Sequence, residues 1–169
     1  MNATNLPGRR RLLAAAAASL LAAGCGFELR KAPIFAFKTL SLSGSTAFIN
    51  YLRRQIRAAG TVELVPPEQA QTAEAILEVL SESRERIVLS TNAAGEVREL
   101  ELRLTLRFRL RTPAGKELLP STEITQRRDI TYNETAALAK ESEAELLFRD
   151  MQNDIAQQTL RRLAAVKTL

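Results

Sequence analysis

A regular alternation of apolar and polar side chains runs along residues 99–111. Leucine or phenylalanine occupies every second position from Leu100 to Leu110, and charged side chains or threonine occupy the positions between them. Because the side chains of a β-strand point alternately to its two faces, this pattern predicts a strand with one buried and one hydrated face. The leucine face must then be covered by another layer of the protein.

Turn signals stand on both sides of this strand. Residues 92–95 read Asn-Ala-Ala-Gly and residues 112–115 read Thr-Pro-Ala-Gly, compositions that are typical of tight turns. Each turn leads to a further extended segment, at residues 75–90 and 117–132. We therefore expect three long strands in succession, the last of them interrupted at Pro120 by a bulge or by an edge position.

Two other segments repeat apolar residues at spacings of three and four, the period of an amphipathic helix. The first ends before the stop signal Gly60, and Ser45 or Thr46 can cap its start. The second spans about residues 134–166, with Asn133 as its cap. We expect both apolar stripes to be core faces. They are Phe48 or Ile49, Leu52, Ile56 and Ala59 in the first helix, and Ala137, Ala144, Phe148, Met151, Ile155, Leu163 and Val166, widened by Leu147 and Leu160, in the second.

Short strands at residues 37–42 and 62–65 complete the pattern. The resulting order of strands and helices predicts an α+β fold. We expect a two-layer sandwich, with two helices packed on one face of a mixed, mostly antiparallel sheet of about four to five strands. The helices cover the leucine face, and the other face of the sheet carries the charges.

The first 25 residues follow a different pattern. Three arginines at residues 9–11 precede an apolar stretch at residues 12–23, which is too short to span a bilayer, and Cys25 follows. This pattern predicts a lipoprotein signal peptide at residues 1–24 and a mature chain whose Cys25 carries a diacylglycerol and an N-acyl chain. The alternative is an ordinary signal peptide with an incidental cysteine. An extended lead-in at residues 25–36 and a single α+β domain at residues 37–169 would follow.

The composition narrows the possible functions. The chain has no histidine and Cys25 is its only cysteine, so most nucleophilic triads and zinc sites are unavailable. Removal of residues 1–24 takes away three arginines and no acidic residue, which lowers the net charge from +5 to +2. We therefore expect no enzymatic activity, no metal or other cofactor, and no nucleic-acid partner.

The hydrated face of the strand at 99–111 is the first candidate site. Two-residue steps of about 6.6 Å along a strand would let its arginines match several phosphates of a glycolipid. Alternatively the face is merely hydrated, with Glu99 and Glu101 pairing across strands, or it lines the wet interior of a larger partner. The arginines are Arg103, Arg107, Arg109 and Arg111.

Lys140 is the second candidate. It stands off the apolar stripe near the start of the long helix, in the sequence Ala-Leu-Ala-Lys-Glu at residues 137–141. Such a lysine can meet an anion, although most lysines in this position are simply hydrated.

Two short motifs resemble a known family. Residues 25–30 read Cys-Gly-Phe-Glu-Leu-Arg, which is similar to the opening of the lipopolysaccharide-assembly lipoprotein family LptE, and residues 137–141 resemble that family's Ala-Leu-Ala-Lys-acidic motif. The two motifs, the cysteine after the signal peptide and the hairpin between them occur in the family's order. The resemblance therefore covers nearly all of the mature chain.

The resemblance implies a fold and a role. The fold is two helices on a mostly four-stranded sheet. The role is that of an outer-membrane lipoprotein that faces the periplasm, plugs the β-barrel LptD, assists its assembly, and helps it insert lipopolysaccharide into the outer leaflet. Gly26, where an aspartate would favour the inner membrane, agrees with that location.

The resemblance also makes Lys140 a candidate for contact with lipopolysaccharide, alongside the arginine face. A second basic residue near the hairpin tip of some members has no counterpart here, since Ser90, Thr91 and Asn92 occupy the turn and Arg86 and Arg98 are the nearest cations. An alternative function is that of a lipoprotein that regulates a periplasmic cell-wall synthase.

Overall fold

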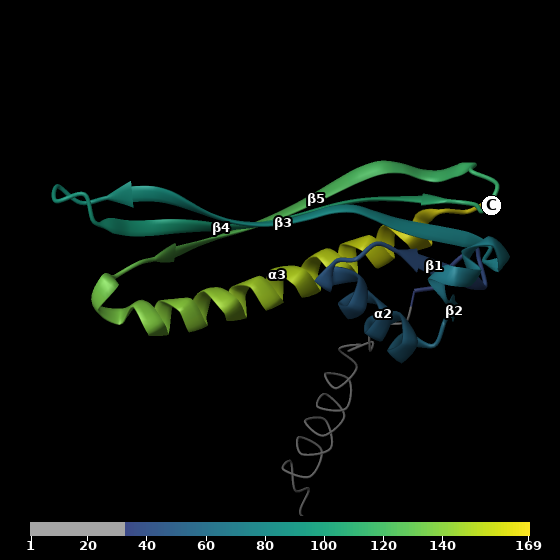
Figure 1. Cartoon of the computed structure of the whole chain (residues 1–169), viewed down its shortest axis with the longest axis horizontal. Coiled ribbons are helices and arrows are strands. Elements are labelled where there is room, and N and C mark those ends of the chain that lie inside the picture. Colours follow the sequence, from purple (N-terminus) through teal and green to yellow (C-terminus); the bar gives the residue numbers. More distant parts are fainter. Residues whose placement is uncertain (1–32) are drawn as a thin grey trace, which may run out of the picture. The chain divides into compact units, whose positions relative to one another are not determined.

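A computed structural model describes residues 33–169. It contains a five-stranded sheet with two α-helices on one of its faces (Figure 1). The strands are β1 (Thr39–Ser43), β2 (Glu63–Val65), β3 (Ala75–Thr91), β4 (Val97–Arg111) and β5 (Glu117–Thr131). The helices are α2 (Ala47–Ala59) and α3 (Ala137–Ala165), with the short 3-10 helices η1 (Pro67–Thr72) and η2 (Glu134–Ala136).

The strand order in the sheet is β2-β1-β3-β4-β5. Strand β1 runs parallel to both β2 and β3, because α2 and η1 carry the chain back between these strands. The three long strands β3, β4 and β5 follow one another as antiparallel hairpins. The expected α+β sandwich with a mixed, mostly antiparallel sheet is therefore confirmed.

The alternation along β4 has the expected consequence. Leu102, Leu104, Leu106, Phe108 and Leu110 are all at most 1% exposed and face the helical layer. The long helix α3 lies along this face of the sheet and contacts β4 and β5, while the shorter α2 packs beside it, near β1 and β2 (Figure 1). The two helices and the leucine face enclose one continuous hydrophobic core.

Strand β3 does not keep a single alternation. A register shift between Val79 and Ser81 turns its side chains over, so that Glu82, Arg84 and Arg86 stand opposite the core leucines of β4. The helix-facing side of β3 is therefore apolar in its first part and polar in its second. We call these polar residues of β3 the inner polar row.

The start of α2 differs from the expectation. Thr46 stands at the cap position, but its side chain makes no capping hydrogen bond. Instead the backbone N–H of Phe48 donates to Oε2 of Glu82, on β3, at 3.2 Å. A carboxylate from the inner polar row thus stabilises the positive end of the helix. The expected stop is confirmed, since Gly60 ends α2 in the left-handed conformation with φ 64°.

Pro120 lies in a bulge of β5 and also in an edge strand. The pairing steps from Phe108–Thr122 to Leu110–Leu119, so β5 has one more residue than β4 in this interval. Because β5 is last in the sheet, a proline without an N–H is tolerated there. Past β5, the side chain of Asn133 accepts a hydrogen bond from the N–H of Thr135 and caps η2, which leads into α3.

Candidate functional surfaces

The sheet face that points away from the helices carries four of the five arginines of β4, namely Arg103, Arg107, Arg109 and Arg111. Antiparallel pairing places Glu78 of β3 directly opposite Arg109. The Glu78 carboxylate accepts hydrogen bonds from Arg109 Nε at 2.5 Å and from Arg111 Nε at 2.7 Å. One carboxylate therefore serves two guanidinium groups.

The other two of these four arginines are also paired. Arg103 bonds Glu101, two residues before it on the same strand, at 2.6 Å, and lies 3.7 Å from Glu85. Arg107 lies 3.2 Å from Glu123, its partner across the β4–β5 ladder. All four of these arginines thus have a glutamate partner, and Arg109 and Arg111 share theirs.

Two outer carboxylates also bond across strands, which is the arrangement that the hydrated-face alternative describes. Glu101 lies within 4.0 Å of Arg127 on β5. Glu99 accepts a hydrogen bond at 2.9 Å from the hydroxyl of Ser90, its register partner on β3. We call this surface of paired arginines and glutamates the charged sheet face.

The two arginines beside Glu78 displace the ionisation of its carboxyl. Burial raises the pKa of its carboxyl, but hydrogen bonds from Arg111 and Arg109 and the positive charges of these arginines outweigh that effect. The pKa of Glu78 therefore lies below its usual range, and the carboxylate stays ionised at neutral pH.

Lys140 lies apart from the four arginines. Its Nζ bonds Glu143 Oε2 at 2.8 Å and Thr131 Oγ1 at 3.1 Å, so it joins the first turn of α3 to the end of β5. Its side chain is 21% exposed. Lys140 and the four arginines therefore do not form a single site.

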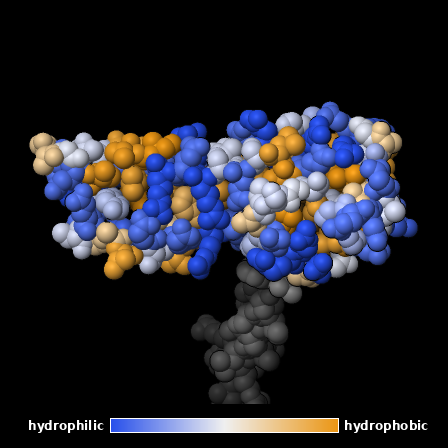
Figure 2. Space-filling model, viewed as in Figure 1, coloured by the Kyte–Doolittle hydropathy of each residue, from blue (hydrophilic) through white to orange (hydrophobic). Residues whose placement is uncertain are grey.

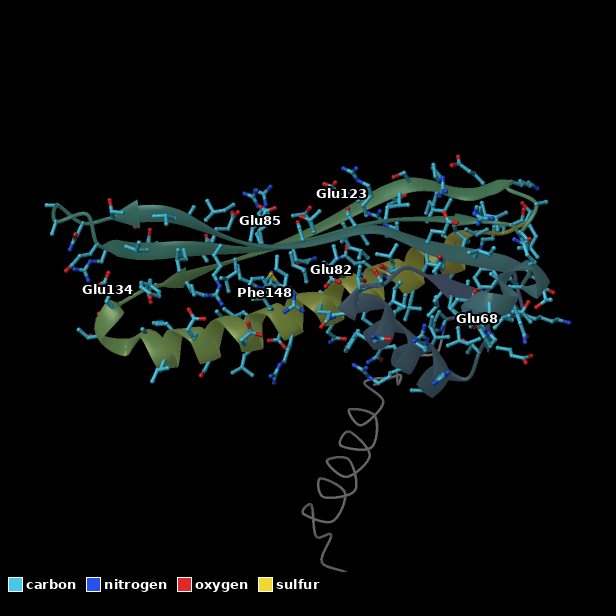
Figure 3. The ribbon with its side chains drawn as sticks, in the orientation of Figure 1. Glu68, Glu82, Glu85, Glu123, Glu134 and Phe148 are labelled. Atoms are coloured by element: carbon cyan, nitrogen blue, oxygen red, sulfur yellow. The ribbon has the colours of Figure 1, made fainter. Side chains whose placement is uncertain are left out.

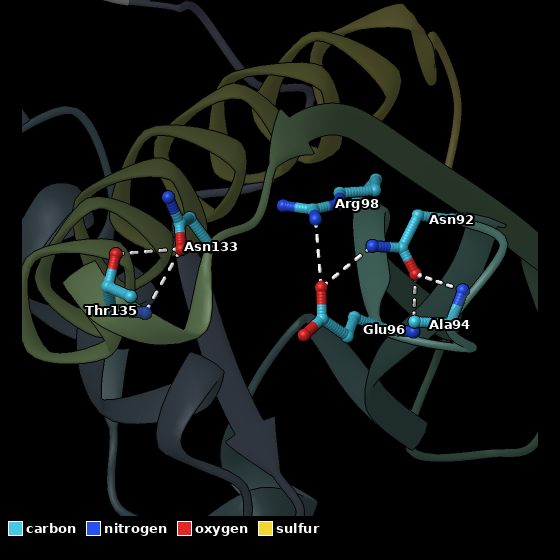
Figure 4. Close-up of polar contacts among 6 residues, drawn as sticks. All are labelled: Asn92, Ala94, Glu96, Arg98, Asn133 and Thr135. Atoms are coloured by element: carbon cyan, nitrogen blue, oxygen red, sulfur yellow. Dashed lines mark hydrogen bonds and ion pairs between the residues drawn. The ribbon is translucent and has the colours of Figure 1, made fainter.

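A small cleft lies between the β3–β4 turn and the start of the helical layer. Its volume is about 310 Å³, and Glu96, Arg98 and Asn133 contribute to its lining. Arg98 Nη2 bonds Glu96 at 2.8 Å, and the same carboxylate accepts from the amide of Asn92 (Figure 4). The cation nearest the turn is thus neutralised by its own hairpin.

The layer between β3 and α3 holds polar contacts that the sequence pattern did not indicate. Arg84 lies over the ring of Phe148 at 5.5 Å, and Arg86 bonds Glu141 of α3 at 2.7 Å. Figure 3 shows Glu82 and Phe148 between the sheet and α3, whereas Glu85 and Glu123 stand on the opposite face. In the sequence, only the run of polar residues in the middle of β3 indicates the inner polar row.

Several large apolar side chains are exposed at the end of the unit that carries the β3–β4 turn. Val88 and Leu89 are about half exposed, and Leu138 and Leu146 of α3 are 87% and 58% exposed. Figure 2 shows orange surface in this half of the folded unit. No helix within residues 33–169 is both long and apolar enough to cross a bilayer.

The expected lipid attachment residue, Cys25, and the signal peptide at residues 1–24 lie outside the described residues. The same is true of most of the lead-in at residues 25–36.

The fold is shared with solved structures of bacterial lipoproteins. A solution structure of lipoprotein B from Nitrosomonas europaea is 31% identical in sequence and superposes with a TM-score of 0.71, covering 83% of this chain and 91% of that one. A crystal structure of the rare lipoprotein B from Shewanella oneidensis is 32% identical with a TM-score of 0.63, covering 75% of this chain and 94% of that one. The class is therefore that of small lipoproteins with an α+β sandwich.

The family follows from the sequence comparison. The model of the family LptE, lipopolysaccharide-assembly, matches residues 37–163. A curated relative from Pectobacterium atrosepticum, the LPS-assembly lipoprotein LptE, is 32% identical over an alignment of 155 residues that covers 88% of this chain and 82% of the relative. The chain belongs to the LptE family, which confirms the family that the sequence resembles.

Proposed function

We propose that this protein is a lipid-anchored component of lipopolysaccharide assembly in the outer membrane, facing the periplasm. The support is its membership of the LptE family, together with the name of the Pectobacterium relative. The anchor is the acylated Cys25, because two or three acyl chains hold a protein on a membrane far more firmly than one. The role is one of binding and needs neither catalysis nor a cofactor.

The specific partner in this proposal is a large LptD-type β-barrel that the folded unit plugs and whose assembly it assists. The main support for the plug role is the charged sheet face. The interior of a large barrel is polar, and a charged group that enters it without a partner is costly. Since each of these four arginines already has a glutamate partner, none of them would enter the barrel unpaired.

Contact with lipopolysaccharide is a further part of the proposal. Lys140, at the family's motif lysine, and the four arginines of the charged sheet face are the cations that would meet its phosphates. Lys140 is the first of these cations to test. Its side chain is only partly exposed and bonds Glu143, and this bond must open before Lys140 can bind an anion. Lys140→Gln should lower retention of the protein on immobilised lipopolysaccharide severalfold, whereas Lys167→Gln, which removes an exposed lysine elsewhere, should not.

Site-specific photocrosslinking in whole cells tests the plug role. A photoreactive residue at Ser83, on the outward face of β3 opposite Thr105, should crosslink to a large outer-membrane barrel protein. The matched position Ser142 is exposed on α3, on the opposite side of the sandwich. Crosslinks from Ser142 alone, or to a protein with a transmembrane helix and a cell-wall synthase domain, would refute the plug role and favour the regulator alternative.

A further inference from the structure

Helix α2 carries three arginines and no acidic residue. Arg53 donates to the side-chain oxygen of Asn50 at 2.9 Å, and the guanidinium of Arg54 lies 5.7 Å from the centre of the Tyr51 ring. Within residues 33–169, none of the three arginines Arg53, Arg54 and Arg57 forms an ion pair with a carboxylate. This sets α2 apart from β4, whose arginines all pair with glutamates.

Two of these arginines line a cleft. It has a volume of about 390 Å³ and lies between Arg53 and Arg57 of α2 on one side and Leu64, Pro66 and Pro67 on the other. Residues four apart on a helix have neighbouring side chains, with Cβ atoms about 5–6 Å apart. The two guanidinium groups can therefore converge on a single phosphate, whose oxygens match their forked N–H donors.

The cleft lies close to the point where the chain joins the folded unit from its lead-in. The N–H of Glu63 donates to the carbonyl oxygen of Lys38 at 2.9 Å, and Leu64 pairs with Leu40 at the start of the sheet. Pro33 stands eight residue steps after Cys25. Such a segment spans at most about 29 Å when fully extended.

We propose that this arginine cleft, formed by Arg53 and Arg57, binds the phosphate groups of anionic phospholipids in the membrane that holds the lipid anchor. The inference rests on the proposed anchorage at Cys25, since the short tether keeps the cleft within reach of the headgroups. Each basic residue close to an anionic membrane surface strengthens binding by about fivefold. Before the unit enters the barrel, a tether alone leaves it free to rotate, whereas this second contact fixes which side of the sandwich faces the membrane.

One acidic residue opposes the attraction. Glu68 is exposed and also lines the cleft, and Figure 3 shows it at the end of the unit that holds α2 and β2. Removal of its charge should therefore strengthen binding of phosphate groups, an effect of opposite sign to the loss of either arginine.

The test uses the mature chain from residue 25 with Cys25→Ser, which has no acyl chains and reports on headgroup binding alone. Its partition onto zwitterionic phosphatidylethanolamine–phosphatidylcholine vesicles is compared with that onto vesicles that also contain phosphatidylglycerol. We expect binding only to the second kind, a loss of roughly 10- to 25-fold with Arg53→Gln/Arg57→Gln, and a gain with Glu68→Gln. The control Arg86→Gln/Arg98→Gln removes the same charge from arginines that already have glutamate partners.

Three outcomes overturn the proposal. Equal losses in the two double variants would mean that only net charge matters, and equal binding to both kinds of vesicle would exclude headgroup recognition. Arginine-dependent binding of inorganic phosphate or of lipopolysaccharide micelles, without binding to phosphatidylglycerol vesicles, would assign the cleft to another anion. Failure of the anchorage itself is seen separately, as an absence of radiolabelled palmitate on the protein with an intact Cys25.

Discussion

Replacing Glu78 by glutamine tests whether the charged sheet face stabilises the fold. Glutamine keeps the shape of the side chain but removes the charge that Arg109 and Arg111 share. A hydrogen bond to a charged group contributes about 1.5–3 kcal/mol when it is buried, and an exposed ion pair contributes at most about 1 kcal/mol. The side chain of Glu78 is 16% exposed, while those of Arg109 and Arg111 are 39% and 24% exposed, so the pairs lie between these limits.

We therefore expect Glu78→Gln to lower the free energy of unfolding by about 1–2 kcal/mol at neutral pH and the Tm by roughly 3–8 °C. Since the pKa of Glu78 is depressed in the folded state, its stabilisation is present above the usual carboxyl value of 4.5 and is lost as the pH falls through the folded pKa. The difference between wild type and variant should thus shrink in acid.

Thermal and urea denaturation followed by circular dichroism, at pH 7 and at several acidic values, measures this difference. Glu123→Gln is the matched control, because Glu123 and Arg107 are 50% and 54% exposed and their pair should contribute less than about 0.5 kcal/mol. If the two variants lose the same stability, or if the loss for Glu78→Gln does not change with pH, the reasoning from burial and shared charge is wrong.

Three further substitutions probe the packing. Leu104→Ala, at a position 1% exposed in the middle of β4, should destabilise the protein by about 2–5 kcal/mol in urea unfolding, and a loss below 1 kcal/mol would place this face outside the core. Glu82→Gln weakens the hydrogen bond from the N–H of Phe48, so we expect the free energy of unfolding to fall by about 0.5–2 kcal/mol. The start of α2 should also fray, which amide exchange measured by NMR would show, and an unchanged exchange rate of the Phe48 amide would contradict this. Gly44→Ala should lower the Tm measurably, because φ is +131° there and a Cβ would lie 2.5 Å from Cδ1 of Ile49; an unchanged Tm would count against the close approach.

Much of the fold could be predicted because its signals are local. The alternation along β4 identifies the buried face from the sequence alone, and Gly60 marks the end of α2 within one helical turn. The capping of α2 could not be predicted in this way. Its acceptor, Glu82, comes from β3, 34 residues after Phe48, and depends on how the two elements pack.

The ion pairs of the charged sheet face could not be predicted from local sequence signals either. The sequence places Arg109 and Arg111 on one face, but their shared partner, Glu78, follows from the register of β3 against β4. The register shift after Val79 could not be predicted from the sequence either, because a bulge depends on how two strands pair. Lys140 was found through a family motif, and its separation from the arginines required the structure.

The register shift in β3 also divides the folded unit by local stability. Before it, Ala75, Leu77 and Val79 bury apolar surface against the helices; after it, Arg84 and Arg86 fill the same layer with side chains that are 38% and 39% exposed. Burial of apolar surface is the main force against local opening. The outer part of the β3–β4 hairpin should therefore exchange its amide hydrogens sooner than the rest of the sheet, and it can bend or repack against a partner while the remainder of the core stays folded.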